Sequence, residues 1–304
     1  MHNPLDHHYV PRAFFKPWAN NEKKLIVYEK KNSLILPPYM QSTKSICVHK
    51  GLYSYTSSVE EQKRNVIESK LFSLIDNNAA KILAELRKIN GLVKISDQHR
   101  YEFAVFLVSL RLRMPEVFLS NAKDSRSTLE KELLKDEPNL HDEEVKRELN
   151  GLTILQWMEK NHLNILENIG NQLLAKQITN EKLVNPIMDM QWLVLKKEVS
   201  GYSFLTSDRP LVAFGSIQQK NLGFAIAISP QRIFFATTNL SSIENFLKLP
   251  DKELIKQANI STIQQAKNKA FSCNKSHSVR FFQNRLGKLH KKIMPWVKEY
   301  EEQK

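Results

Sequence analysis

Two adjacent histidines near the start of the chain are the side chains with the clearest potential for chemistry. They open the segment HHYVPR at His7–Arg12. Imidazole titrates near neutral pH and is a common metal ligand, so His7 or His8 could act as a general base or bind a metal ion. Adjacent side chains on an extended chain point to opposite faces, and we expect one histidine to serve a site while the other packs. The alternative is a surface segment whose histidines share no role.

A carboxylate at the end of an apolar strand is the second candidate. The segment FLTSDRP at Phe204–Pro210 places Asp208 where the strand ends, and Pro210 disfavours a helical conformation for Arg209. Loops held by a rigid scaffold often present reactive groups, so Asp208 could orient His8 or share a divalent metal ion with it. The alternative is a turn residue, because aspartate accepts hydrogen bonds from nearby backbone.

Arginines near these segments could hold an anion. Arg12 closes the first segment, and Arg113 lies two residues before Pro115. A guanidinium fork suits phosphate or carboxylate, although Arg113 could also be an exposed residue at a helix end. The predicted catalytic set is therefore His7, His8, Asp208, Arg12 and Arg113.

Basic residues gather towards the C-terminus. From Lys267 to Lys298 the chain contains nine lysines or arginines and no acidic residue, with aromatic residues interleaved. Cations neutralise phosphates and aromatic rings stack on unpaired bases, which favours nucleic acid as a partner. The alternative is that the rings belong to the core and the charges form a solvated face. The residues predicted to bind nucleic acid are Arg280, Arg285, Lys288, Lys291 and Lys292.

The overall composition agrees with an anionic partner. The 304 residues carry a formal net charge of +13, which favours nucleic acid over a membrane surface, although a lysine-rich solvated surface would give the same value. Two cysteines without a CxxC pair argue against a cysteine zinc site and suit a reducing compartment. No apolar run approaches the roughly 20 residues of a membrane-spanning helix, and we expect a cytoplasmic protein. Nothing in the sequence indicates an oligomeric state.

Hydrophobic periodicity predicts an α+β protein. We expect an antiparallel sheet with a mainly helical middle lobe packed against it, within a single domain of residues 1–304. The helical lobe should span about 58–184, and the sheet core about 7–56 and 190–240. Basic C-terminal helices should follow at about 251–300.

Within this plan the individual elements follow from spacing and capping residues. Helices are predicted at 58–90, at 96–114 with Ser96 as its cap and Pro115 as its end, at 152–174 with His162 in the core, at 251–270 and at 278–300. Strands are predicted at 24–29, 33–36, 191–199, 202–206, 222–229 and 233–238. The highly charged stretch 121–150 is either a solvated helical pair or an insertion.

The N-terminal segment is also similar to the His-His-Ile-Val-Pro start of HNH nucleases, in which a histidine is a general base. That pattern requires further residues on the following helix, and Glu29 and Lys30 stand where Asn or His would be needed. The similarity is therefore local.

Several separated segments extend the comparison along nearly the whole chain. They are HHYVPRAFFKPWA at His7–Ala19, KLIVYEK at Lys24–Lys30, VEEQKRNVIE at Val59–Glu68, RMP at Arg113–Pro115, FLTSDRP at Phe204–Pro210, ISP at Ile228–Pro230 and NISTIQQAKNKAFS at Asn259–Ser272. Together they resemble the bacterial family called domain of unknown function 4238. Arg209 departs from the asparagine more usual there, and Phe14-Phe15 from Tyr-Leu. The resemblance implies that His7, His8 and Asp208 form one site, and it implies no reaction.

These features favour a hydrolase acting on nucleic acid or another phosphorylated substrate, such as a nuclease. In this hypothesis His8 is the general base or a metal ligand, Asp208 orients it or shares the metal, and Arg12 and Arg113 hold phosphate. A role as a toxin or phage-defence effector is an analogy with other compact basic proteins. The alternative is a non-catalytic module that binds nucleic acid or an acidic protein through the basic C-terminal helix.

Overall fold

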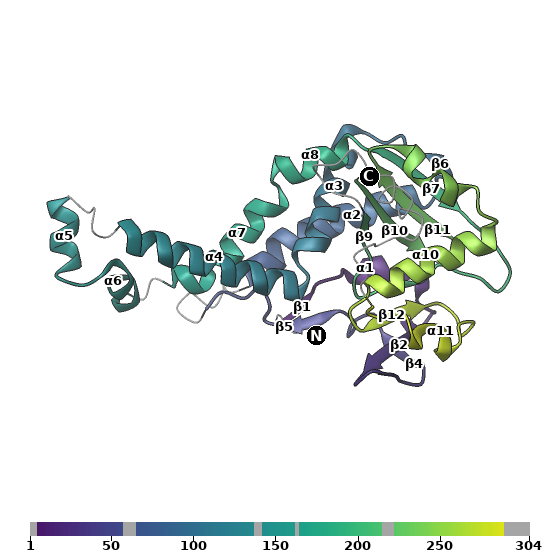
Figure 1. The fold of residues 1–304 in the computed structure, drawn as a ribbon, viewed down its shortest axis with the longest axis horizontal. Helices are drawn as coiled ribbons and strands as arrows, with labels where there is room; N and C mark the ends of the chain where they lie inside the picture. The colour runs from purple at the N-terminus through teal and green to yellow at the C-terminus, as the bar shows by residue number, and fades with distance from the viewer. Residues whose placement is uncertain (1–4, 57–64, 137–141, 162–163, 215–221, 289–304) are drawn as a thin grey trace, which may run out of the picture.

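The computed structural model describes residues 5–56, 65–136, 142–161, 164–214 and 222–288. It has an α+β fold, with antiparallel sheets formed by both ends of the chain and a helical middle region (Figure 1). The predicted fold class is therefore confirmed.

The elements follow the chain in the order given by their numbers. The strands are β1 (Asp6–His8), β2 (Lys24–Lys31), β3 (Leu34–Ile35), β4 (Tyr39–Ser42), β5 (Val48–Lys50), β6 (Gly91–Leu92), β7 (Gln191–Lys196), β8 (Thr206–Ser207), β9 (Val212–Phe214), β10 (Gly223–Ser229), β11 (Arg232–Thr237) and β12 (Lys269–Ser272). The α-helices are α1 (Arg12–Phe15), α2 (Ser73–Leu86), α3 (Asp97–Leu112), α4 (Pro115–Asp136), α5 (Glu143–Leu149), α6 (Ile154–Lys160), α7 (Ile165–Ile178), α8 (Glu181–Met188), α9 (Glu244–Leu247), α10 (Asp251–Gln265) and α11 (Val279–Gln283). Short 3-10 helices occupy Lys16–Trp18 and Leu240–Ile243, and a π-helix occupies Ile67–Phe72.

The strands of the described residues form two larger sheets. One has the order β6-β7-β11-β10-β9, and the other has the order β3-β2-β12-β8 with β4 also paired to β2. β1 and β5 pair separately. All these pairings are antiparallel. The sheet core predicted from the two ends of the chain is thus divided, and β12 joins the N-terminal β2 to the later β8.

The apolar strand β2 is buried because both of its faces are covered. Successive side chains alternate between the faces of a strand. Leu25 and Val27 belong to the main hydrophobic cluster, whereas Ile26 and Tyr28 belong to a second cluster with α10 and α11. Tyr28 stacks on Phe282 of α11, with ring centroids 4.0 Å apart. The C-terminal elements therefore cover the outer face of this sheet.

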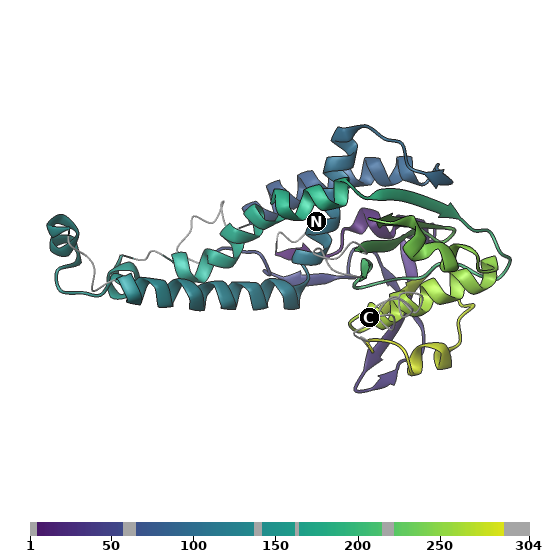
Figure 2. The ribbon, with the colours of Figure 1, turned by 45° about the horizontal axis from the view of Figure 1, so that its top comes forward.

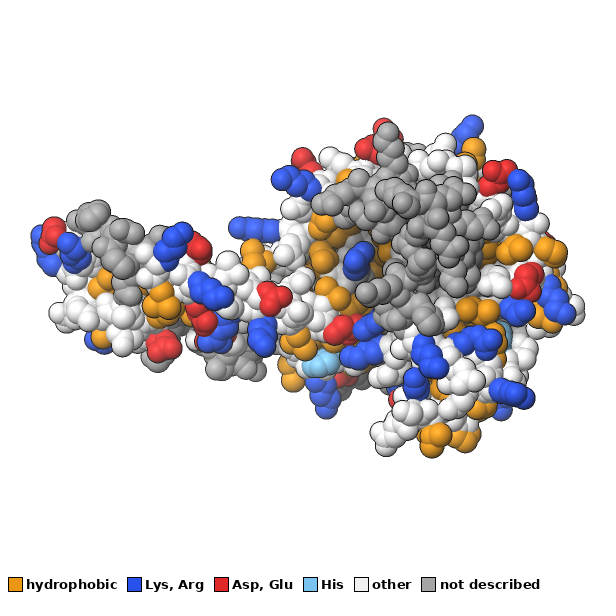
Figure 3. Space-filling model, viewed as in Figure 1, with side chains coloured by type: hydrophobic (Ala, Val, Ile, Leu, Met, Phe, Trp, Pro, Cys, Tyr) orange, Lys and Arg blue, Asp and Glu red, His pale blue; other side chains and the backbone are white. Residues whose placement is uncertain are grey.

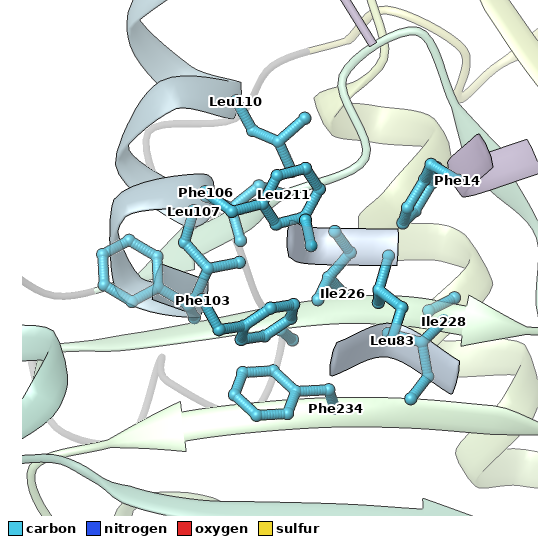
Figure 4. Packing of buried hydrophobic residues seen from close by; sticks show 14 of the residues in the cluster. Phe14, Leu83, Phe103, Phe106, Leu107, Leu110, Leu211, Ile226, Ile228 and Phe234 are labelled. Carbon is cyan, nitrogen blue, oxygen red and sulfur yellow. The ribbon is translucent and has the colours of Figure 1, made fainter. Parts of the chain in front are cut away.

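The main core lies between α3 and the sheet of β10 and β11 (Figure 4). Phe103, Phe106, Leu107 and Leu110 form an apolar stripe with spacing of three and four residues along α3, and each has 0% exposure. The ring of Phe103 meets that of Phe234 edge to face at 5.2 Å. Because burying one such side chain contributes about 1.5–3 kcal/mol, this stripe is sufficient to hold α3 on the sheet.

A helical arm extends away from the sheets (Figures 1 and 2). α4 and α7 lie side by side along it, and α5 and α6 lie at its far end. The two long helices approach closely, since a Cβ added at Gly170 of α7 would lie 2.5 Å from Cβ of Ala122 in α4. α5 has no buried residue, so this part of the charged stretch is helical and solvated.

Several predicted boundaries need correction. α3 is capped by Ser96 and the chain breaks before Pro115, as predicted, and α4 begins at that proline. The helix predicted at 58–90 instead begins, within the described residues, as a π-helix and ends at Leu86 before β6. The helix predicted at 152–174 is two helices, α6 and α7. Ser58, the first residue of the helix predicted at 58–90, and His162 lie outside the described residues.

The predicted C-terminal helices are also shorter than expected. α10 ends at Gln265, and Lys269–Ser272 is the strand β12 rather than the end of that helix. Ala266 is already extended, with ψ 149°, and the backbone that follows it is held by the side chain of Asp208, the residue directly after β8. α11 covers only Val279–Gln283, and residues 289–304 lie outside the described part of the chain.

Candidate functional site

A pocket of about 540 Å³ lies between the N-terminal segment and the start of α2. Its volume is within the range of small-molecule sites. The lining residues are His8, Pro11, Arg12 and Ala13 from the N-terminal segment, and Asn65, Glu68, Ser69, Ser73, Asp76 and Asn77 from the π-helix and α2 region. We call it the His8–Glu68 pocket.

His7 faces the core rather than the pocket. Its ring has 0% exposure and stacks on Tyr53 at 5.6 Å with an interplanar angle of 2°. Its Nδ1 accepts a hydrogen bond from the backbone N–H of Tyr53 at 3.0 Å, so in the neutral ring Nε2 carries the proton and donates to Asn65 Oδ1 at 3.2 Å. His7 therefore packs and ties the N-terminal segment to the residues before α2.

His8 lines the pocket, as the alternation of side chains predicts. Its Nε2 lies 3.2 Å from the backbone carbonyl oxygen of Lys44. Because a carbonyl only accepts, Nε2 carries the proton and the lone pair of the neutral ring is on Nδ1. β1 holds this residue in place by pairing His8 with Val48 of β5.

The carboxyl group of Glu68 has a pKa that is raised towards neutral pH. It lies on the π-helix Ile67–Phe72, a conformation found often at functional sites. Oε1 accepts a hydrogen bond from the backbone N–H of His8 at 3.3 Å, whereas Oε2 has no hydrogen-bond partner among the described residues. Burial raises the pKa of Glu68 from 4.5 to about 7, against the opposing effects of the His8 N–H and Arg113.

The fully buried Arg113 and the partly buried Asp76 form an ion pair at the base of this region. Arg113 has 0% exposure, and its Nη1 donates to Asp76 Oδ1 at 2.9 Å. The guanidinium also lies 5.0 Å from the centre of the Phe72 ring. Burial raises the pKa of Asp76, and Arg113 opposes that rise. Arg113 thus acts on the pocket through Asp76, which lines it.

Arg12 is the cation that lines the pocket directly. It is the first residue of α1, directly after Pro11. The side chain is partly buried, and its Nε has no hydrogen-bond partner among the residues described. The guanidinium therefore supplies positive charge to the pocket lining, and its fork of N–H donors suits an oxyanion.

Asp208 is placed elsewhere and has a structural role. Its carboxylate accepts three backbone hydrogen bonds, from Lys267 at 2.8 Å, Asn268 at 2.9 Å and Lys269 at 3.1 Å. It lines a separate cavity of about 30 Å³ that also contains Tyr9 and does not include His8. Asp208 and His8 therefore line different cavities in the structure. Instead, this carboxylate holds the turn that leads from α10 into β12.

We expect Asp208→Asn to destabilise the fold without a specific effect on the His8–Glu68 pocket. The side-chain amide would direct one of its N–H groups towards one of the three backbone N–H donors. These two donors would then face each other without an acceptor, which lowers the free energy of unfolding by about 1–3 kcal/mol. Urea unfolding would measure this loss. Asp97→Asn, at an exposed position in the first turn of α3, is the matched control and should change stability by about 0.5 kcal/mol or less. Equal stability of the two variants would contradict the structural role of Asp208.

The predicted nucleic-acid-binding residues are only partly described. Arg280 and Lys288 are exposed. Arg285 lies 5.2 Å from the Phe281 ring and donates from Nη1 to the carbonyl oxygen of that residue. Figure 3 shows lysine and arginine side chains gathered over the region of β12, β2 and α11. The other two predicted residues, Lys291 and Lys292, lie outside the described residues.

Glu68 and Asp76 are pocket residues that the sequence did not single out. Both lie within an apolar helical pattern, where an acidic residue is usually assigned to the solvated face. The available indication was that Glu68 ends the shared segment VEEQKRNVIE. Among the described residues no group of three or more His, Cys, Asp or Glu side chains is placed to hold one metal ion. Within the same ranges no helix is long and apolar enough to cross a membrane.

Comparison with known proteins places the chain in a family. The model of a family described as "Protein of unknown function (DUF4238)" matches residues 6–276. No curated protein and no solved structure matches the chain significantly.

Proposed function

We propose that this chain, which belongs to the DUF4238 family of proteins of unknown function, is a hydrolase that acts on a phosphorylated substrate in the His8–Glu68 pocket. The observation that carries the proposal is the convergence of three groups on one pocket. Glu68 offers an oxygen with no hydrogen-bond partner among the described residues, Arg12 offers a cation, and His8 offers an imidazole.

Each group has a role that follows from its chemistry. Glu68 is the general base, because a base is most effective when its pKa is close to the working pH. Arg12 holds the phosphate and neutralises the charge that develops on it. His8 is the second proton-transfer group, with the tautomer set by the Lys44 carbonyl. Asp76 and Arg113 position the floor of the pocket.

The segments that carry the family resemblance support this location. HHYVPR contributes His8 and Arg12, VEEQKRNVIE contributes Glu68, and RMP contributes Arg113 through its ion pair with Asp76. FLTSDRP contributes the Asp208 turn instead. A metal ion shared by His8 and Asp208 is therefore no part of the proposal.

The test is turnover of phosphoesters by the purified full chain. Substrates would be bis(p-nitrophenyl) phosphate, p-nitrophenyl phosphate, mixed RNA and mixed DNA, each with and without a chelator. We expect turnover of at least one substrate by the wild type. Arg12→Lys keeps the charge but removes the guanidinium fork, and should lower kcat/KM about 10-fold to 100-fold. Arg147→Lys, at an exposed position on α5, is the control. Absence of turnover on all four substrates would reject the proposed activity.

The alternative proposal is a binding module without catalysis. It is supported by the exposed cations Arg280 and Lys288 and by Arg285, whose guanidinium lies 5.2 Å from the centre of the Phe281 ring. This alternative expects binding of RNA or DNA that weakens steeply with salt, no turnover, and no effect of Arg12→Lys on affinity.

A further inference from the structure

We infer that the substrate is RNA, cleaved by attack of its own 2′-hydroxyl group on the adjacent phosphorus atom. This inference rests on the proposed function, because it uses the same pocket and assigns the substrate class. Three groups are needed for this reaction: a base for the 2′-hydroxyl, an acid for the leaving oxygen and a cation for the phosphate. Glu68, His8 and Arg12 are groups of these three kinds, and all line one pocket.

The reaction balances without a co-reactant. Oε2 of the Glu68 carboxylate takes the proton of the 2′-hydroxyl, and the 2′-oxygen forms a bond to phosphorus. The bond from phosphorus to the 5′-oxygen breaks, and protonated His8 donates a proton from Nδ1 to that oxygen. The products are a 2′,3′-cyclic phosphate and a 5′-hydroxyl end, with Glu68 protonated and His8 neutral. Both residues regain their starting states by proton exchange with water.

The hydrogen bond between Glu68 and the His8 backbone suits the roles of Glu68 as base and His8 as acid. Oε1 accepts a hydrogen bond from the His8 backbone N–H, which orients the carboxylate, and we assign the buried Oε2, which has no hydrogen-bond partner among the described residues, as the atom that accepts the proton. Nε2 of His8 is held by the Lys44 carbonyl, so the second proton of the imidazolium is on Nδ1. Glu68 can therefore accept a proton and His8 can donate one while the hydrogen bonds at Glu68 Oε1 and His8 Nε2 stay in place.

The rest of the pocket is also suited to a nucleotide. Ser69, Ser73 and Asn77 line it with hydroxyl and amide groups, which both donate and accept hydrogen bonds. Ribose hydroxyls and the edges of unpaired bases are recognised by groups of this kind. Lys44, whose carbonyl binds His8, and Lys70, which follows Ser69, are both exposed and can attract flanking phosphates.

The test uses oligodeoxynucleotides with a single ribonucleotide, in four versions that differ in the base of that residue. Matched all-DNA oligonucleotides and versions with a 2′-O-methyl group at the same position are the substrate controls. We expect the full chain to cleave only after the ribonucleotide and to leave a 2′,3′-cyclic phosphate, identified by mass spectrometry. Glu68→Gln should reduce the rate at least 100-fold, whereas Glu159→Gln, at an exposed position on α6, should leave it unchanged.

The outcomes separate the inference from the proposed function. Cleavage of the all-DNA or 2′-O-methyl oligonucleotides at the rate of the ribonucleotide substrate would overturn the inference and leave the phosphoesterase proposal standing. Turnover of p-nitrophenyl phosphate without cleavage of any oligonucleotide would also overturn the RNA inference and leave the phosphoesterase proposal standing. No turnover of any substrate would overturn both.

Discussion

Replacing Glu68 with glutamine is expected to lower the proposed hydrolase activity at least 100-fold while stabilising the folded protein above neutral pH. Glutamine cannot accept the substrate proton, and loss of a general base lowers the rate by about 100-fold to 10,000-fold. The stabilisation arises because the wild-type carboxyl group is costly to ionise where it lies: burial, reinforced by Asp76, raises its pKa from 4.5 to about 7.

The pH range of this stabilisation follows from proton binding. Between pH 4.5 and about 7 the folded state holds a proton on Glu68 that the unfolded chain has released. The wild-type free energy of unfolding therefore falls as the pH rises through this window, by about 3 kcal/mol in all. Glu68→Gln should be about 3 kcal/mol more stable than the wild type at pH 8, with little difference at pH 4.

Urea unfolding at pH 4 and pH 8, together with initial rates, measures both effects. Glu159→Gln, whose carboxyl group is exposed, should change neither stability nor rate. The wild-type kcat/KM should also rise with pH up to about 7, as Glu68 loses its proton. A Glu68→Gln variant with the same stability difference at both pH values would contradict the raised pKa of this carboxyl group.

Arg113→Met is expected to be the most destabilising change in the region of the pocket. It leaves the partly buried Asp76 without its cation, and the loss should be about 3 kcal/mol, at the lower end of the range for buried pairs, because Asp76 keeps some contact with solvent. The double variant Arg113→Met/Asp76→Asn removes both charges and should recover most of that loss, since a buried pair contributes little beyond a neutral pair of similar shape. Denaturant unfolding of the three proteins at pH 7 gives the comparison.

An exposed ion pair provides the matched control for Arg113. Arg126 and Glu130 lie one turn apart on α4, with Nε and Oε1 2.8 Å apart. Arg126→Met should cost less than about 1 kcal/mol, because exposed pairs are well solvated without each other. If the double variant at Arg113 and Asp76 were as unstable as Arg113→Met, the loss would instead come from packing of the Arg113 side chain on Phe72 and Phe106.

Features that depend on neighbours in the chain could be predicted from the sequence. The buried stripe of α3 follows from spacing of three and four residues, and its ends follow from Ser96 and Pro115. The opposite directions of His7 and His8 follow from the geometry of an extended chain. Strand positions in the second half of the chain were predicted within a few residues for β7, β10 and β11.

Features that depend on distant partners could not be predicted in the same way. The pairing of β2 with β12 joins Glu29 to Lys269, and no local pattern distinguishes that partner from the other apolar strands. The end of α10 was placed too late, because the side chain that holds the following turn is Asp208, 59 residues from Lys267 along the chain.

Local pattern was sufficient to assign most helices and strands and to nominate His8 and Arg12. It predicted Asp208, at a strand end, as the partner of His8, whereas the carboxyl group that accepts a hydrogen bond from the His8 backbone in the structure is Glu68, on a π-helix 60 residues after His8. The physical reason is that the sequence gives only the residue type, and an acidic residue has the same side chain whether it holds a turn or lines a pocket. Its surroundings decide whether three backbone N–H groups occupy its oxygens, as at Asp208, or whether burial leaves one oxygen without a protein partner among the described residues, as at Glu68.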